Sequence, residues 1–191
     1  MLIGIGGKAG AGKSTVAEYL LAKHAFKIYA FADPLKEMLL ALNPLKDRDG
    51  VRVADLVHGY SWDYAKKYPE VRRLLQRLGT EAGREILGEH VWVQHLARRI
   101  IEDGNEPWQD DAGYVAADVV VPDVRFQNEK EWIKVNEGYL IYVNSPLTDD
   151  RAAGHASETS FTAEDADIVI NNNGTHEDLY EKIDYLMERI G

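Results

Sequence analysis

A glycine-rich segment near the start of the chain carries the most specific chemical signal in the sequence. Residues 7–14 read GKAGAGKS and match G-x-x-x-x-G-K-[ST], the pattern of a phosphate-binding loop (P-loop), at every fixed position. Its glycines let backbone amides turn inward around phosphate oxygens, and the N-terminus of the following helix adds positive charge. Lys13 would reach the β- and γ-phosphates, and the Ser14 hydroxyl would bind Mg²⁺. The residues predicted to bind ATP here are Gly7, Ala9, Gly10, Ala11, Gly12, Lys13, Ser14 and Thr15.

Two acidic residues directly follow predicted strands, where a carboxylate can face a transferred phosphoryl group. Asp33 could accept a proton from the acceptor or order a water bound to Mg²⁺, and it could also simply cap the helix that begins there. Lys36, one turn further on, could bind the acceptor phosphate. Asp123 could hold Mg²⁺ and Arg125 could clamp a phosphate with two hydrogen bonds, the alternative being a surface turn capped by the aspartate.

Further positive charge and polar side chains follow in helices and loops. Arg84 is the best phosphate-binding candidate among the basic residues Arg72, Arg73, Arg77 and Arg84. Arg151 lies in a polar loop between the last two predicted strands, together with the sequence HASE at residues 155–158. A lid in this place would close over the phosphates and exclude water, although a plain surface loop is the alternative. Residues 171–174, after the last strand, could line the adenine through backbone contacts or form a turn. Asn171 and Asn173 are the two of them predicted to bind ATP.

Composition excludes several other classes of protein. The 191 residues carry a formal net charge of −10, which opposes bulk electrostatic binding of nucleic acid or anionic membrane. The chain has no cysteine, so it has neither a disulfide framework nor a thiol nucleophile. Its apolar runs are too short for a membrane span, and it begins without the features of a signal peptide. We therefore expect a soluble protein that is not exported.

The absence of several motifs excludes or disfavours other classes of P-loop protein. The chain has no Asn-Lys-x-Asp motif of the kind that selects guanine, and DRDG at residues 47–50 follows no predicted strand. A loose match to the acidic motif of motor ATPases ends at Asp123, and no G-x-S-x-G hydrolase motif is present. These observations favour a small-molecule kinase.

Short apolar runs alternate with amphipathic segments along the chain. Strands are predicted at residues 2–6, 27–32, 115–121, 139–144 and 166–171, and helices at 14–24, 33–43, 70–81, 90–101, 126–137 and from 176 onward. Asp33 is expected to cap the second helix, glycine to break the chain at 79–81, and Thr175 with Asp178 to cap the last helix. The alternation predicts an α/β fold with a five-stranded, mostly parallel sheet, whose carboxyl edge gathers residues 7–15, 33–36 and 123–129.

Together with the P-loop, four segments resemble the bacteriophage deoxynucleoside monophosphate kinases. They are FADPLK at 31–36, LGTE at 78–81 with Arg84 and Trp92, DVRF at 123–126 with Asn128 and Glu129, and HASE at 155–158. The resemblance implies an adenylate-kinase-like fold in a single domain. Its core would be residues 1–44 and 93–191, with an acceptor-binding helical insertion at about 45–92 and a lid at about 146–163. It also implies ATP with Mg²⁺ as donor, a deoxynucleoside monophosphate as acceptor, and a diphosphate product.

The resemblance also implies roles for individual residues. Lys13, Asp33, Arg125 and Arg151 would be catalytic, and Ser14 and Asp123 would bind the metal. Gln76, Trp92 or a nearby tyrosine would contact the base. The implied substrate-binding residues are Asp33, Lys36, Gln76, Arg77, Arg84, Trp92, Asp123, Arg125, Asn128, Glu129, His155 and Glu158.

Other functions remain open on the sequence alone. A kinase of another small acceptor, such as dephospho-coenzyme A, would share the P-loop and an aspartate after the second strand. A protein acting on a nucleic-acid strand would need a basic track with stacking aromatics, which the acidic charge opposes. A nucleotide-binding regulator without turnover is a further alternative. We expect a small nucleotide as partner, a cytoplasmic location (that of the host if phage-encoded) and, as is common among such kinases, dimerisation.

Overall fold

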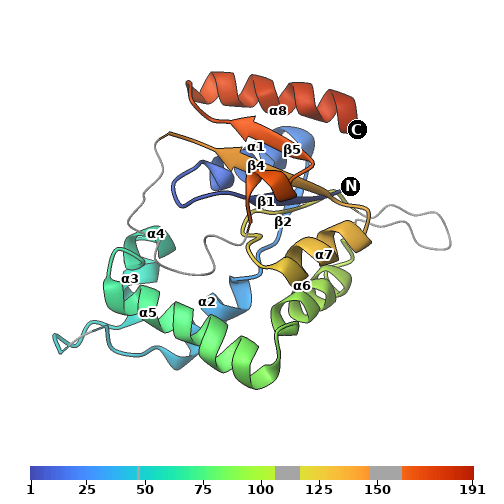
Figure 1. Ribbon diagram of the computed structural model, residues 1–191. Helices are drawn as coiled ribbons and strands as arrows, with labels where there is room; N and C mark the ends of the chain where they lie inside the picture. Colours follow the sequence, from blue (N-terminus) through green and yellow to red (C-terminus); the bar gives the residue numbers. More distant parts are fainter. Residues whose placement is uncertain (47, 106–116, 147–160) are drawn as a thin grey trace. The chain divides into compact units, whose positions relative to one another are not determined.

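The chain folds into two compact units. The computed structural model describes residues 1–46, 48–105, 117–146 and 161–191. One unit comprises Met1–Phe31 with Leu96–Gly191, and the other comprises Ala32–His95. The first contains the sheet and the second is built from helices (Figure 1).

Five parallel strands form the sheet of the first unit, in the order β2-β3-β1-β4-β5. The central strand β1 pairs with β3 through Ile3↔Val120 and with β4 through Ile5↔Ile141. The strands are β1 (Leu2–Gly6), β2 (Lys27–Ile28), β3 (Val119–Val121), β4 (Tyr139–Asn144) and β5 (Ile168–Asn171). The predicted α/β class and five-stranded parallel sheet are thus confirmed. Since the described pairings are all parallel, the strands' carboxyl ends meet at one edge.

Residues of β1 alternate between two faces of the sheet, as period-two side-chain geometry requires. Ile3 and Ile5 pack in the main core with α1 (Lys13–His24) and α8 (His176–Ile190). The other face is covered by α7 (Gln127–Val135), which comes so near that a Cβ on Gly4 would lie 2.9 Å from Cγ1 of Ile133. Both faces of the central strand are therefore buried, and the loop that follows it starts from a rigid point.

Three predicted strands are longer than the observed ones. The strand predicted at 27–32 ends at Ile28, because β2 pairs only with the short strand β3. Beyond it the chain leaves the sheet, and the backbone N–H of Phe31 donates to Oδ1 of Asp123 at 3.0 Å. The strand predicted at 115–121 is Val119–Val121, with residues 115 and 116 outside the described part. The last strand begins at Ile168 rather than Ala166.

The second unit encloses a small apolar core of its own. Buried side chains of Leu39, Val53, Leu56, Ala65 and Val71 form it. Its elements are α2 (Asp33–Leu42), α3 (Val53–Gly59), α4 (Trp62–Ala65), α5 (Pro69–Arg77) and a π-helix, η1 (Leu78–Leu87). The next helix, α6 (Val91–Glu102), begins in this unit and ends in the first. The first unit also contains the 3₁₀ helix η4 (Ala163–Asp165).

Two predicted helix boundaries are wrong. Asp33 does not cap α2 but lies in its first turn, because Ala32 already has helical dihedrals and its carbonyl accepts from the N–H of Lys36 at 3.1 Å. Glycine does not break the chain at 79–81, since the helix continues there as η1. Two other predictions are confirmed, namely the end of α2 before Asn43 and the capping box of Thr175 with Asp178. No helix in the described ranges is both long and apolar enough to span a membrane.

Candidate nucleotide-binding site

The P-loop joins the carboxyl end of β1 to the N-terminus of α1. Gly7, Gly10 and Gly12 have φ values of 140°, 78° and 100°, a region that side chains other than glycine rarely adopt. At Gly7 a Cβ would also collide with the backbone carbonyl of Val143 in β4. The glycines therefore provide the backbone conformation that the sequence pattern predicted, and Gly7 provides space as well.

The start of α1 is open to an anion. Among the described residues no side chain caps it, and its first turn contains no acidic residue. The first amides of a helix have no partner within the helix, and its dipole attracts negative charge. Ser14 is exposed in this turn and Thr15 is half-buried. This end of α1 can therefore receive phosphate oxygens.

The side chain of Lys13 folds back over the loop. Its Nζ donates to the carbonyl oxygen of Gly7 at 2.7 Å and to that of Lys8 at 2.8 Å. The ammonium group thus lies against the loop that would surround the phosphates. A phosphate oxygen is a stronger, charged acceptor than these two carbonyls and could take over the amine.

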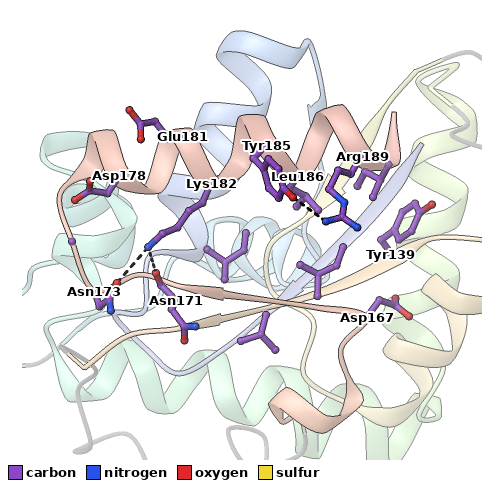
Figure 2. Close-up of a pocket in the computed structure, with 15 residues that line it drawn as sticks. Tyr139, Asp167, Asn171, Asn173, Asp178, Glu181, Lys182, Tyr185, Leu186 and Arg189 are labelled. Atoms are coloured by element: carbon purple, nitrogen blue, oxygen red, sulfur yellow. Dashed lines mark hydrogen bonds between the residues drawn. The ribbon is translucent and has the colours of Figure 1, made fainter.

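An asparagine that the sequence analysis did not select contacts the P-loop. Nδ2 of Asn172 donates to the carbonyl oxygen of Ala11 at 3.0 Å, across 161 residues of sequence. The predicted residues on either side, Asn171 and Asn173, instead line a groove of about 1080 Å³ between β5 and α8 (Figure 2). The run of three asparagines after a strand was visible in the sequence. Which of them faces the loop depends on the strand register.

The groove of Figure 2 has its own polar contacts. Nζ of Lys182 donates to the backbone oxygen of Asn171 at 2.7 Å and lies 3.4 Å from Oδ1 of Asn173. Nη1 of Arg189 donates to the hydroxyl of Tyr185 at 3.0 Å. The contact of Lys182 with Asn171 ties α8 to the edge strand β5, and that of Arg189 with Tyr185 lies within α8. The contact with adenine predicted for Asn171 and Asn173 stays a prediction.

A second loop follows the carboxyl end of β3. Oδ1 of Asp123 accepts from the backbone of Phe31, and the N–H of Val124 donates to the carbonyl of Ile5 at 3.1 Å. Glu129 is only 3% exposed, and its Oε2 accepts from the N–H groups of Arg125 at 2.7 Å and Phe126 at 3.0 Å. Glu129 thus holds the loop from inside, Asn128 is buried next to it, and Arg125 is exposed.

The oxygen atoms near the P-loop are of a type that suits Mg²⁺. Hydroxyl, carboxylate and phosphate oxygens are the ligands that this ion prefers. Ser14 offers a hydroxyl at the start of α1, and Asp123 is a half-buried carboxylate after β3. The donor chemistry of both residues fits the predicted metal.

The second unit contains the remaining described candidates. Nζ of Lys36 pairs with Oδ1 of Asp33 at 2.8 Å on α2. Nε of Arg77 pairs with Oε2 of Glu81 at 2.9 Å, Gln76 is exposed, and Arg84 is half-buried.

Trp92 is packed inside the second unit. The side chain is 5% exposed, its Nε1 donates to the carbonyl of Gly79 at 2.9 Å, and its ring covers Gly83. Gly83 of η1 therefore makes room for the indole, and Gly79 accepts its hydrogen bond. Three further predicted residues, Arg151, His155 and Glu158, lie outside the described residues.

A parallel sheet whose central strand leads through a glycine loop into a helix defines a P-loop nucleotide-binding protein. A solved structure of similar fold is TT1252 from Thermus thermophilus, with a TM-score of 0.53 and 20% identity over 100% of this chain and 98% of that one. This likeness concerns the fold.

Sequence comparisons specify the family. A family model described as deoxynucleotide monophosphate kinase matches residues 57–183. A protein of Acanthamoeba polyphaga mimivirus, provisionally named deoxynucleotide monophosphate kinase, is 34% identical over 96% of this chain and 94% of its own length. The deoxynucleotide monophosphate kinase of Enterobacteria phage T4 is 27% identical over 86% of this chain and 61% of its own length. The chain belongs to the deoxynucleotide monophosphate kinase family, and is thus a nucleotide kinase with a small nucleotide as substrate.

Proposed function

We propose that the protein transfers the γ-phosphoryl group of ATP to a deoxynucleoside monophosphate in a reaction that requires Mg²⁺. A phosphate oxygen of the acceptor would form the new bond to the γ-phosphorus as the bond to the β–γ bridging oxygen breaks. The products would be a deoxynucleoside diphosphate and ADP. The observation that carries this proposal is the P-loop, with left-handed glycines at Gly7, Gly10 and Gly12 and Lys13 folded onto its carbonyls.

The donor side of the reaction would be handled by the first unit. Lys13 would leave the carbonyls of Gly7 and Lys8 and bind the β- and γ-phosphates, while the amides at the start of α1 bind their remaining oxygens. Ser14 and Asp123 would hold Mg²⁺, which spreads the charge of the phosphates. Arg125, exposed after β3, and Arg151 would stabilise charge on the transferred group.

The acceptor would bind through residues of Ala32–His95, the unit that contains the helical insertion expected at about 45–92. Asp33 and Lys36, paired on the first turns of α2, would exchange partners when an acceptor phosphate binds the lysine and frees the carboxylate. Arg77 and Arg84 add positive charge on α5 and η1. Catalysis of this kind depends on positioning and charge neutralisation rather than on a covalent intermediate.

The test is an ADP-release assay with ATP and Mg²⁺ against a panel of acceptors. The panel contains the four deoxynucleoside monophosphates, the ribonucleotides, dephospho-coenzyme A and an oligonucleotide, and each reaction is repeated with Mg²⁺ removed by chelation. Purified Lys13→Ala protein serves as the control for contaminating kinases. Turnover on deoxynucleoside monophosphates that is lost with chelation and in Lys13→Ala supports the proposal. Turnover only on another acceptor would refute the substrate class while keeping the P-loop chemistry.

A further inference from the structure

The carbonyl groups of the P-loop need partners on its outer side. A loop that points its amides at phosphates must point carbonyls away, and buried carbonyls rarely stay unpaired. The carbonyl of Lys8 accepts from the N–H of Ala11 at 3.2 Å, and that of Gly12 accepts from Val16 at 3.0 Å. These two contacts are local. The side chain of Ala11 is fully buried, and its carbonyl accepts instead from Nδ2 of Asn172, which lies 161 residues further along the chain.

Asn172 is itself firmly placed. Its backbone N–H donates to the carbonyl of Asn144 at 2.7 Å, which extends the pairing of β4 with β5 by one residue. Nδ2 of Asn144 donates to Oδ1 of Asn171 at 3.1 Å, and Lys182 of α8 holds the backbone oxygen of Asn171. The half-buried Asn172 side chain therefore projects from a turn that two strands and a helix support.

Gly12 and Asn172 are complementary in shape. A Cβ on Gly12 would lie 2.5 Å from Nδ2 of Asn172, well inside van der Waals contact. Because Gly12 also has a φ of 100°, glycine is needed there for conformation and for the approach of the asparagine. A backbone carbonyl only accepts hydrogen bonds, so it is the amide nitrogen of Asn172 that must face Ala11.

We propose that Asn172 is a positioning residue that preorganises the P-loop for the phosphates of the nucleotide. The inference rests on the proposed function only in taking ATP as the ligand of this loop. When Lys13 leaves Gly7 and Lys8 to bind phosphate, its two contacts across the loop are lost, but the contact between Asn172 and Ala11 remains. It keeps the loop in its binding conformation, so less ordering has to occur when ATP binds.

The experiment measures equilibrium binding of ATP and of inorganic tripolyphosphate, without acceptor, by calorimetry. Asn172→Ala removes the donor, and Asn172→Asp keeps the shape and the backbone bond to Asn144 but places a carboxylate against the Ala11 carbonyl. Asn136→Ala is the matched control, because Asn136 is also half-buried and its Nδ2 donates to a backbone carbonyl, that of Trp132, at 2.8 Å. Thermal unfolding of each variant is recorded in parallel.

We expect Asn172→Ala to raise the Kd of both ligands by up to about tenfold, the effect of one net hydrogen bond. Asn172→Asp raises both further, because its charge also repels phosphate. Asn136→Ala leaves both unchanged despite a comparable loss of thermal stability. If Asn172→Ala fails to fold, the Kd values of the isosteric Asn172→Asp variant decide whether Asn172 positions the loop.

Three results would overturn the inference. They are unchanged Kd values in the Asn172 variants, an equal loss in Asn136→Ala, and a loss for ATP without a loss for tripolyphosphate, which would mean a contact with the base. Wild-type protein that binds ATP but phosphorylates no deoxynucleotide would refute the proposed substrate and leave the role of Asn172 standing.

Discussion

The two units hold their candidate site residues by different means. In the sheet-containing unit, backbone groups of the P-loop form the site, and its two ends are held by the central strand β1 and by helix α1. In the unit of Ala32–His95, the candidates Gln76, Arg77 and Arg84 are side chains on helices. A local run of glycines determines backbone geometry, whereas the direction of a helical side chain depends on which face is buried. A sequence motif therefore specifies a site most reliably where the backbone does the binding.

Both units nevertheless share one packing device, a glycine covered by an aromatic ring. Phe161 lies on Gly6 at the end of β1, and Trp92 lies on Gly83 in η1. Both rings are 5% exposed. The first contact supports the residue just before the P-loop, and the second supports the helix that contains Arg84. Replacing each of these glycines by alanine can therefore test whether the first unit binds the donor and the second binds the acceptor, as proposed.

The largest effect is expected from Lys13→Ala, which removes the ammonium group from the P-loop. We expect kcat to fall by roughly 10²–10³-fold or more, the range for losing one contact to transition-state charge, with the fold intact. Lys8→Ala is the control, because it removes a positive charge from the same loop but keeps the carbonyl that accepts from Lys13. Steady-state kinetics and circular dichroism provide the measurements. A fully active Lys13→Ala enzyme would refute the mechanism.

Gly6→Ala and Gly83→Ala come next and test the comparison directly. Each added methyl group collides with a buried ring, which we expect to cost about 1–3 kcal/mol of unfolding free energy in either unit. Their kinetic effects should differ. Gly6→Ala should raise the KM for ATP, and Gly83→Ala should raise the KM for the acceptor.

Gly59→Ala is the matched control for both substitutions. Apart from its chain neighbours and the backbone of its own helix, no heavy atom of the described residues lies within 4 Å of the position where its Cβ would be, and Gly59 ends α3. Urea unfolding and steady-state kinetics on the three variants give the answer. If Gly6→Ala changes only acceptor binding, or Gly83→Ala only ATP binding, the proposed assignment of ATP to the first unit and of the acceptor to the second is wrong.

A smaller effect distinguishes an ion pair with one buried partner from an exposed pair. In the first unit, Lys130 is 6% exposed, and its Nζ pairs with Oδ1 of Asp165 at 2.8 Å. Asp165→Asn removes the negative charge from this contact with a buried ammonium and should cost about 1–3 kcal/mol. In the second unit, Glu70→Gln removes the charge from the exposed contact with Arg73 and should have a clearly smaller effect. Equal losses in chemical denaturation would contradict this difference.

The same ion pair predicts a dependence of stability on pH. The hydrogen bond from Lys130, followed by those from Thr162, holds the pKa of Asp165 below its ordinary value. The stability it contributes is therefore complete above the unfolded-state pKa of about 3.9 and is lost as the pH falls through the lower folded value. Urea unfolding at decreasing pH should show this loss in wild-type protein and a flatter dependence in Asp165→Asn. Identical pH profiles would rule out this contribution.

The smallest effect concerns salt. Arg73 lowers the pKa of Glu70 on the surface of the second unit, so this pair also favours the folded state above the acid range. Salt at roughly 1 M shortens the Debye length to about 3 Å and should remove most of the contribution of an exposed pair. Asp165→Asn should then abolish part of the pH dependence that remains at high salt, because hydrogen bonds from Thr175 also lower the pKa of Asp178. A high-salt pH dependence that Asp165→Asn leaves unchanged would contradict the prediction.

Much of the fold follows from local patterns in the sequence. The P-loop glycines, the existence of five strands along the chain and the cap of α8 by Thr175 and Asp178 depend on residues close together in the chain, and these predictions are confirmed. The strand predicted at 27–32 was too long, because its length depends on how far a remote partner, β3, extends beside it. Similarly, Gly79 signals a helix break in isolation but lies within η1, where its carbonyl accepts from Nε1 of Trp92.

By itself the sequence determined that the chain has a loop for phosphates and a sheet to support it, because backbone conformation at glycine is a local property. Only the tertiary structure decided which side chains face that loop. The register of β5 places Asn172 rather than Asn171 or Asn173 against Ala11, which lies 161 residues away in the sequence. Such assignments depend on contacts between residues far apart in the chain, and the packing of the whole unit determines them.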